Sequence, residues 1–493
     1  MASKDGLLER IEWEPLRSRR EWILTECCAD LPDGTKSVFV ERDAAYHLSA
    51  STIGTCPSDH VAPAMDRLEG SQTPGELVRG PDLVLHTRDG TLEVAGYLAR
   101  NWTFDHAEPW DRAQFRVAFF TNRITEIAPH DADIAWLTDW YLNGPRDTPW
   151  MRASKRSFKS TFSRSWRTSA SHPAEFRGAQ SGGGSIDHFV LGAEGWECVV
   201  HAVPKGIGPE WSSNVGITYL PSPGPMPGKD VRLALEELVG FVFGRRLMRI
   251  ASVGFDAAGF PKRSTMVSPW GTNVRGVCAK PDFPLLPFSF VRENGASVEQ
   301  ALASLLPTYL QLREPLRLDD VLWRLWLGNE APSTMDVPIF ASGLEILASA
   351  WFKHVESKSK GTYMPKDDFD RLLEDELTAI STKVTRVPFG DRMVRKIKRA
   401  YETSGNERLR WFFDEIGLPI GPAEESALRA RNQAVHPTRA HTAEEIVGFI
   451  RTAHVYRTLM VRAILKLLSW KGSYLDYGAL GHPVRGLDEP SGG

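Results

Sequence analysis

The sequence of 493 residues contains few cysteines, and none of them has the paired spacing that metal sites and redox motifs use. There are five, an odd number, and no two are separated as Cys-x-x-Cys. A disulfide framework and a structural zinc site are therefore both unexpected, and buried free thiols in a reducing compartment fit better. We accordingly expect a cytoplasmic protein that uses no metal and no cofactor. The cysteines are Cys27, Cys28, Cys56, Cys198 and Cys278.

Long hydrophobic runs are also absent. The first 20 residues contain no apolar core of the kind that a signal peptide has. No uninterrupted apolar stretch approaches the ~20 residues that a membrane-spanning helix needs. The apolar segment 454–470 near the C-terminus is interrupted by Arg457 and Arg462. We therefore expect no membrane contact.

The sequence also lacks an excess of charge of either sign, because its net charge is only -3. No general attraction to nucleic acid follows from it, so any contact with RNA has to come from a local basic surface. The glycine run Gly182–Gly184 is not a phosphate-binding loop, since no Gly-Lys-Ser/Thr follows it.

The remaining composition is that of an ordinary globular protein, and the pattern changes near residue 290. Before it, short runs rich in β-forming residues alternate with turns, which is typical of antiparallel strands. Afterwards apolar residues recur every three or four positions, which predicts amphipathic helices in a bundle. The fold class expected is α+β, with a β-rich N-terminal half followed by an all-α bundle. The clearest strand candidates are 37–41, 92–99, 115–120, 197–204 and 215–220, and a helix is expected over 230–247.

This pattern predicts a division of the chain into four parts. A first β-rich lobe spans 1–170, and a second spans 171–290, with Ser171–Ser185 as a linker or exposed loop at the boundary. The bundle spans 291–478, and a Gly/Pro-rich flexible tail spans 479–493. Eleven of the sixteen tryptophans precede residue 290. They fill β-sheet cores or, alternatively, form an aromatic surface that recognises a ligand such as a sugar. Helices are expected over 298–312, 318–328, 337–357, 368–384, 391–404, 421–436 and 442–470.

The sixth of these helices has clear start and stop signals. Pro422 suits the first helical position, and the acidic Glu424 and Glu425 follow in the first turn, where the helix dipole favours negative charge. Pro437 ends the helix, because a residue before proline is pushed out of the α region. Thr442 begins the next helix with a capping-box pattern. His436 is thus expected at the C-terminal end of a helix.

The segment that leads to this histidine, Arg431–His436, has the order Arg-Asn-Gln-Ala-Val-His. Asn432 and His436 are four residues apart and share one helix face, whereas Arg431 is ~7.5 Å from His436 along the axis. A histidine can move the proton of an RNA 2′-hydroxyl, and an arginine can stabilise charge on the phosphoryl oxygens. The alternative is that Asn432 and His436 only cap a helix end.

Spacing alone does not single out this segment. Arg-x4-His also occurs at Arg42 and at Arg167, but neither of these arginines is followed by asparagine. Only the third copy has the asparagine, the bounded helix and the helical surroundings.

With these features, Arg-Asn-x-x-x-His before the last long helix resembles the HEPN superfamily over roughly residues 330–475. The β-rich half, with 243–261 leading toward the bundle, is similar to ApeA-like anti-phage proteins. The resemblance implies a metal-independent endoribonuclease that leaves a 2′,3′-cyclic phosphate. It also implies a homodimer with a composite site, and abortive infection on sensing a phage-derived trigger. Arg431, Asn432 and His436 match the motif, and Glu345 corresponds to an acidic residue of some members or is a surface residue.

The RNA, with transfer RNA as one candidate, is expected to bind basic residues near this helix. Residues 381–412 contain nine Lys or Arg against three acids, which indicates a phosphate-binding surface or merely a solvated helix face. A second basic run, 152–167, has interleaved aromatics and fits either a base-stacking surface or a strand pair. The tentative RNA-binding residues are Arg392, Arg395, Lys396, Lys398, Arg399 and Arg429.

One other function is compatible with the sequence. The tryptophan-rich half then recognises a ligand or a phage protein, and the helical half only forms a dimer, without catalysis. A metal-dependent nuclease is less compatible, because no cluster of carboxylates and histidines is evident in the sequence.

Overall fold

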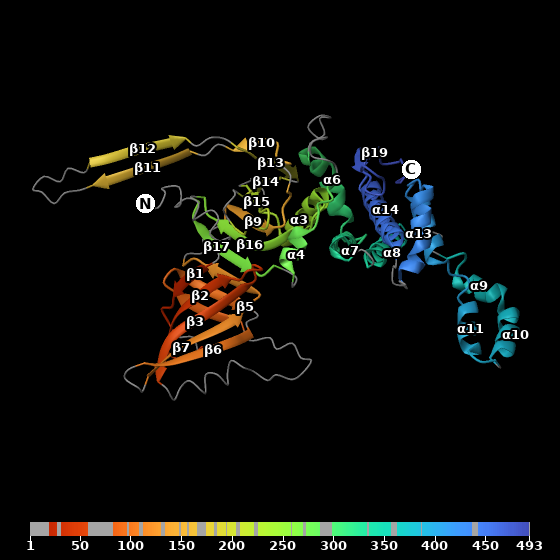
Figure 1. The fold of residues 1–493 in the computed structure, drawn as a ribbon, viewed down its shortest axis with the longest axis horizontal. Helices are drawn as coiled ribbons and strands as arrows, with labels where there is room; N and C mark the ends of the chain where they lie inside the picture. Colours follow the sequence, from red (N-terminus) through yellow and green to blue (C-terminus); the bar gives the residue numbers. More distant parts are fainter. Residues whose placement is uncertain are drawn as a thin grey trace, which may run out of the picture. The chain divides into compact units, whose positions relative to one another are not determined.

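The computed structural model divides the chain into two compact units. The β-rich unit comprises Met1–Gly228 and Leu247–Asp282, and the helical unit comprises Lys229–Arg246 and Phe283–Gly493. Figure 1 labels their helices and strands. The residues that the structure describes are 19–26, 31–57, 82–95, 98–107, 112–129, 134–146, 149–154, 157–164, 174–181, 185–193, 195–203, 208–220, 225–257, 259–269, 273–285, 298–332, 335–355, 362–385, 387–435 and 442–492.

Antiparallel sheets build the β-rich unit, as the alternating strand and turn pattern predicted. A five-stranded sheet has the order β1 (Arg19–Ile23), β2 (Thr35–Arg42), β3 (Leu48–Pro57), β7 (Arg112–Phe120) and β6 (Leu98–Ala107). A ten-stranded sheet has the order β10 (Arg152–Ser154), β13 (Ser185–Ala193), β14 (Trp196–Ala202), β15 (Val215–Tyr219), β9 (Trp136–Leu142), β16 (Met248–Phe255), β17 (Pro261–Val267), β8 (Arg123–Ile127), β5 (Gly90–Ala95) and β4 (Leu83–Thr87). A separate pair joins β11 (Ser157–Arg164) to β12 (Ala174–Ser181), and α4 (Val274–Ala279) follows β17.

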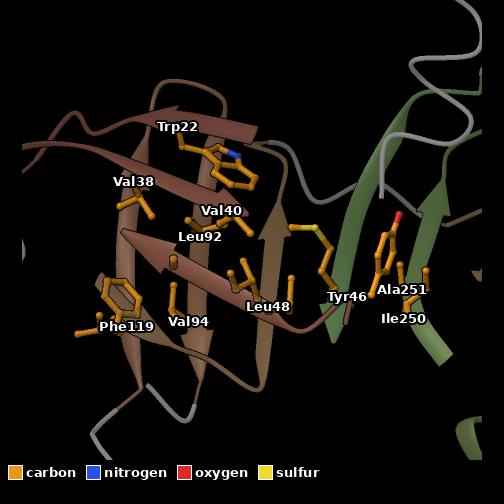
Figure 2. Packing of buried hydrophobic residues seen from close by; sticks show 14 of the residues in the cluster. Trp22, Val38, Val40, Tyr46, Leu48, Leu92, Val94, Phe119, Ile250 and Ala251 are labelled. Carbon is orange, nitrogen blue, oxygen red and sulfur yellow. The ribbon is translucent and has the colours of Figure 1, made fainter. Parts of the chain in front are cut away.

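The two larger sheets share one hydrophobic core. Burial alternates along the strands, as in β4, so one face of each sheet is apolar and buried. Figure 2 shows Trp22, Val40 and Leu92 in this core, and these residues come from β1, β2 and β5. The short helix α4 adds Val274 and Cys278 to the same cluster. Of the tryptophans, Trp22 and Trp140 are almost fully buried, which agrees with a role in filling the β core.

His201 of β14 lies in the interior of the ten-stranded sheet. Its Nε2 is 3.0 Å from the hydroxyl of Thr218, and its ring meets Trp140 edge to face. Gly216 leaves the necessary space, because a Cβ there would come within 2.4 Å of the imidazole. Burial lowers the pKa of His201 to about 4, with smaller opposing effects from the Ala202 carbonyl and from Asp187. The folded unit therefore holds His201 neutral.

This histidine is expected to make the stability of the β-rich unit depend on pH. Unfolding returns its pKa to about 6.5, so the unfolded chain binds the proton more tightly. The neutral histidine contributes about 3 kcal/mol to the free energy of unfolding. This contribution is fully present above pH 6.5 and is lost as the pH falls toward 4. Urea unfolding of wild type and His201→Gln between pH 4 and 7 measures it. Parallel pH profiles for the two proteins would contradict the assignment.

The strand pairing corrects three sequence-based expectations. Residues 92–99 are not one strand, because β5 belongs to the ten-stranded sheet and β6 to the five-stranded sheet. The expected linker Ser171–Ser185 contains β12, which pairs with β11 over its whole length. The boundary at residue 171 does not separate two lobes, since strands from both sides of it alternate in the ten-stranded sheet. The pairing of strands, which the local sequence pattern does not reveal, decides all three.

The helical unit contains α3 (Lys229–Phe243), α6 (Val298–Leu312), α7 (Leu318–Glu330), α8 (Asp336–His354), α9 (Lys366–Leu372), α10 (Glu374–Val384), α11 (Gly390–Ile397), α12 (Gly405–Glu415), α13 (Pro422–Val435) and α14 (Ala443–Leu467). A short hairpin, β18 (Ser473–Leu475) and β19 (Val484–Gly486), follows them. The expected helical C-terminal region is thereby confirmed. Within the described residues, none of the helices is long and apolar enough to cross a membrane.

Helix α8 is central to the helical unit, because it contacts α7, α12, α13 and α14. Its apolar residues, such as Leu344 and Leu347, are fully buried. Gly343 allows a close approach to α14, since a Cβ there would lie 2.5 Å from the methyl group of Met460. Helix α13, which carries the motif, contacts α8 and α14, the two longest described helices of this unit.

The helical unit also includes α3, which the sequence pattern grouped with the β-rich half. Glu237 of α3 accepts one hydrogen bond of 2.7 Å from the hydroxyl of Tyr309 in α6 and two of 2.7 Å from Arg313, which directly follows that helix. These contacts connect helices that are separated by more than 50 residues in the chain. The helical unit therefore resumes at Phe283, near the change of pattern expected at residue 290, and it also includes the earlier segment Lys229–Arg246.

The segment 479–492 differs from the flexible tail expected from its glycines and prolines. The carboxylate of Asp476 accepts hydrogen bonds from the side chain of Arg485 and from the backbone of Gly492, at 2.8 and 3.0 Å. The hydroxyl of Tyr474 donates to the carbonyl of Glu489. These bonds hold the segment against Tyr474 and Asp476, and an ion pair of 2.7 Å between Asp488 and Lys466 joins it to the end of α14.

Two helices also differ from expectation. Residues 368–384 form α9 and α10 instead of one helix, with a break at Leu373. Helix α12 was not expected, although Ser404 and Glu407 form a complete capping box at its start.

Candidate functional site

The N-terminus of α13 is built as the sequence indicates, with Pro422 at the first helical position. Glu424 in the first turn does more than favour the helix dipole. Its side chain reaches back and accepts a hydrogen bond of 2.9 Å from the backbone N–H of Gly421. It thereby satisfies a donor that the helix itself leaves unpaired.

The other oxygen of Glu424 binds Arg462 of α14, and both side chains are completely buried. Arg462 also donates to the carbonyls of Pro419 and Leu487, each at 3.0 Å. Burial raises the pKa of the Glu424 carboxyl, while Arg462 and the backbone donors act in the opposite direction. This cluster joins α13, α14 and the C-terminal segment at one point.

The position of the motif follows from the helical register. Ala427 and Leu428 are buried, and Arg431 and Asn432 each come four residues after one of them. Their backbone belongs to the last turns of α13, which ends at Val435. Their side chains, and the whole of His436, lie outside the described residues. The structure therefore confirms the helix that carries the motif and does not test the geometry of the three side chains.

Helix α14 begins as expected. The hydroxyl of Thr442 accepts from the backbone of Glu445, and the Glu445 carboxylate accepts from the backbone of Thr442, which completes the capping box. The first two turns are solvent-exposed even though they carry apolar side chains. Ile446, Val447 and Ile450 are 46%, 63% and 36% exposed. An apolar surface therefore lies on the helix that directly follows the motif segment.

The candidate RNA-binding cations are exposed as expected. Five of them lie in α11 or directly after it, namely Arg392, Arg395, Lys396, Lys398 and Arg399. They are not all unpaired, since Arg399 binds Glu402 at 2.6 Å. The sixth, Arg429 on α13, is 3.4 Å from Glu425 and is only two residues before Arg431. Helix α11 packs on α10, whereas α13 packs on α8 and α14.

An exposed aromatic residue accompanies the cations of α11. Phe389, just before the helix, is 72% exposed, and the guanidinium of Arg392 lies 5.7 Å from its ring centre. Its φ angle of 64° is in the left-handed region, which is uncommon for a bulky residue. Cations beside an exposed aromatic ring are the combination that single-stranded nucleic acid binds through phosphate contacts and base stacking.

Three further candidates have clear positions. Glu345 lies half-buried on α8, the helix that contacts α13. Asp367 and Asp368 occupy the first turn of α9, and Asp368 binds Arg371 at 2.6 Å. In the described parts of the chain, no three His, Cys, Asp or Glu side chains come together as a group that could hold a metal ion.

The buried roles of Glu424 and Arg462 were not expected from the sequence. A signal for them was present, because a charged residue within an otherwise apolar helix needs a buried partner. The segment 454–470 contains two such arginines, Arg457 and Arg462.

Comparison with known proteins adds no relative from which a function could be transferred. No family model, no curated protein and no solved structure matches the chain.

Proposed function

We propose that the chain is a metal-independent endoribonuclease of the HEPN type that acts in the cytoplasm in anti-phage defence. His436 moves the proton of the attacking 2′-hydroxyl or of the leaving oxygen, Arg431 stabilises the phosphoryl charge, and Asn432 orients the phosphate. RNA supplies its own nucleophile, so a 2′,3′-cyclic phosphate is left without a metal. Transfer RNA is one candidate substrate, and a phage-derived trigger releases the activity.

The observation that carries this proposal is the motif at the end of α13, directly before the capped helix α14. The buried pair of Glu424 and Arg462 supports it, because it fixes the start of the motif helix on its neighbour. A rigid support of this kind is what a catalytic group needs in order to keep its orientation.

A homodimer is part of the proposal. The exposed residues Ile446, Val447 and Ile450 begin the helix that follows the motif, and burial between two copies would remove them from water. A two-fold axis through this surface brings two α13–α14 connections together. The two copies of the motif then build one composite site.

The proposal is tested by incubating the purified protein with RNA in EDTA. We expect cleavage, and 3′ ends that resist phosphatase until acid opens the cyclic phosphate. Cleavage that stops in EDTA and returns with magnesium would instead indicate a metal-dependent nuclease. The absence of cleavage both with and without metal would favour the non-catalytic alternative.

The basic surface of α11 makes a separate prediction about RNA affinity. Replacing Arg395, Lys396 and Lys398 together with glutamine should weaken RNA binding at every sequence tested. The slope of the logarithm of the RNA association constant against the logarithm of the salt concentration should fall by about 2, because each phosphate contact on a single strand releases about 0.7 counterion. Filter binding at several salt concentrations measures it.

A matched control changes the same net charge elsewhere in the unit. Arg317, Lys353 and Lys471 are also exposed, and their replacement with glutamine should leave the salt slope unchanged. Equal slopes for the two triple variants would mean that α11 does not bind RNA.

A further inference from the structure

Two buried arginines of α14 have different surroundings. Arg462 has a carboxylate partner in Glu424. Arg457, five residues earlier and only 4% exposed, has none among the described residues. Its Nε donates to the side-chain oxygen of Asn329 and its Nη2 to the carbonyl of Phe283, both at 3.0 Å. The aromatic rings of Phe283 and Tyr477 lie 4.3 and 4.7 Å from its guanidinium carbon. Its charge is therefore buried without an opposite charge.

A buried cation in this state is costly unless an anion or several hydrogen bonds compensate it. Burial lowers the pKa of Arg457 to about 10, and a smaller influence of Tyr477 acts in the opposite direction. The site is thus short of negative charge.

Arg457 lines a small cavity within the helical unit. The walls come from α3, α7, α14, the segment 283–285 and the hairpin, with Phe241, Leu325 and Val461 among the apolar contributors. The space suits one guest about the size of a water molecule, so a nucleotide or a larger organic ligand cannot enter. Aromatic and aliphatic walls give such a guest few other partners.

Two residues of the cavity wall carry donors that have no hydrogen-bond partner in the described structure. They are the indole Nε1 of Trp326 and the hydroxyl of Thr458, and both residues are more than nine-tenths buried. A helical threonine usually donates to the carbonyl four residues earlier, as Thr452 of the same helix does toward Gly448 at 2.8 Å. Thr458 makes no such bond, so its hydroxyl remains available to a guest.

The nearby acceptors are already used. Arg457 occupies the carbonyl of Phe283 and the amide oxygen of Asn329, and the hydroxyl of Tyr477 donates to the carbonyl of Pro284. The cavity therefore has a surplus of donors and a buried positive charge. From this combination we infer that the cavity binds one small inorganic anion of the size of chloride, held by Arg457, Trp326 and Thr458.

Differential scanning fluorimetry of the full-length protein tests this inference. The melting temperature is measured in sodium gluconate and in sodium chloride at equal ionic strength. At a chloride concentration ten times its Kd, we expect the chloride sample to melt about 4 °C higher. Equal melting temperatures in the two salts at all concentrations would overturn the inference.

Two variants that remove one donor each and keep the shape of the side chain locate the effect. Thr458→Val and Trp326→Phe should each lose half or more of the stabilisation by chloride. Thr452→Val is the matched control on α14, and it should keep the full response, because Thr452 does not line the cavity. A uniform response in all three variants would mean that chloride acts elsewhere.

A bromide soak gives a direct measurement. Bromide scatters anomalously, and a peak enclosed by Arg457, Trp326 and Thr458 is the expected result. A water molecule in the cavity, with bromide bound only at the surface, would overturn the inference. Neither outcome depends on the proposed ribonuclease activity.

Discussion

His436→Ala and Arg431→Ala are each expected to lower the rate of RNA cleavage by about 10²- to 10⁴-fold. A positioned general acid or base contributes a factor of this size, and loss of a donor to the phosphoryl oxygens has a similar effect. The two effects should not add, because both groups act in the same step. Single-turnover cleavage of a labelled RNA by the purified variants measures them.

Two controls separate chemistry from folding. Circular dichroism and thermal unfolding should be the same for both variants and for wild type. His47→Ala changes the histidine of another Arg-x4-His pair, where His47 lies 3.5 Å from Asp43, and it should leave cleavage unchanged. Full activity of the His436→Ala variant would remove this residue from the site. Protection against phage by inactive variants would favour the ligand-binding alternative.

The composite site can be tested with the same two variants. If Arg431 of one copy acts with His436 of the other, a mixture of the two inactive proteins contains heterodimers with one complete site. We expect partial recovery of cleavage on mixing. Recovery requires exchange of subunits, so the mixture is refolded together. An inactive refolded mixture, alongside active refolded wild type, would argue for a site within one chain.

The parts of the fold that were predictable are those with local signals. Helix α14 follows from the pattern Thr442-x-x-Glu445, in which both hydrogen bonds close within four residues. The strand β15 follows from a short run of β-branched and aromatic residues. Helix α12 shows the limit of such signals, because its capping residue Ser404 is present but Gly405 and Asn406 weaken the helical pattern after it.

The parts that were not predictable depend on partners far apart in the chain. Nothing near Glu237 indicates that it binds Arg313, which is 76 residues later. The membership of α3 in the helical unit rests on such contacts. The separation of β5 from β6 also depends on pairing, since β5 pairs with β8, which lies beyond β6 and β7 in the chain, whereas β6 pairs with β7.

Glu424→Gln is expected to destabilise the helical unit by about 3–5 kcal/mol, which is the typical cost of breaking a buried ion pair by removing one partner. Glutamine retains the shape of the side chain and can still accept the hydrogen bond from Gly421. The guanidinium of Arg462, however, then remains completely buried without its negative partner. Guanidinium chloride unfolding, followed by the fluorescence of the tryptophans, measures the shift of the midpoint.

A neighbouring carboxylate provides the matched control. Glu425 is partly exposed and binds Arg410 and Arg429 only at 3.3 and 3.4 Å, so Glu425→Gln should change stability by no more than about 0.5 kcal/mol. The double variant Glu424→Gln with Arg462→Met removes both charges and should recover part of the loss. Equal stability of Glu424→Gln and wild type would mean that the buried pair contributes nothing.

The Glu424→Gln variant also distinguishes two roles of the ion pair between Glu424 and Arg462, namely stabilising the fold and orienting α13. Below its melting temperature, Glu424→Gln is folded, and Arg431 and His436 are unchanged in it. If the pair only stabilises the fold, the folded variant cleaves RNA at the rate of wild type. If it also orients α13, kcat falls in the folded protein while RNA affinity, which we propose depends on the exposed cations of α11, remains the same. Because Glu424 begins the helix that the motif ends, we expect the second result.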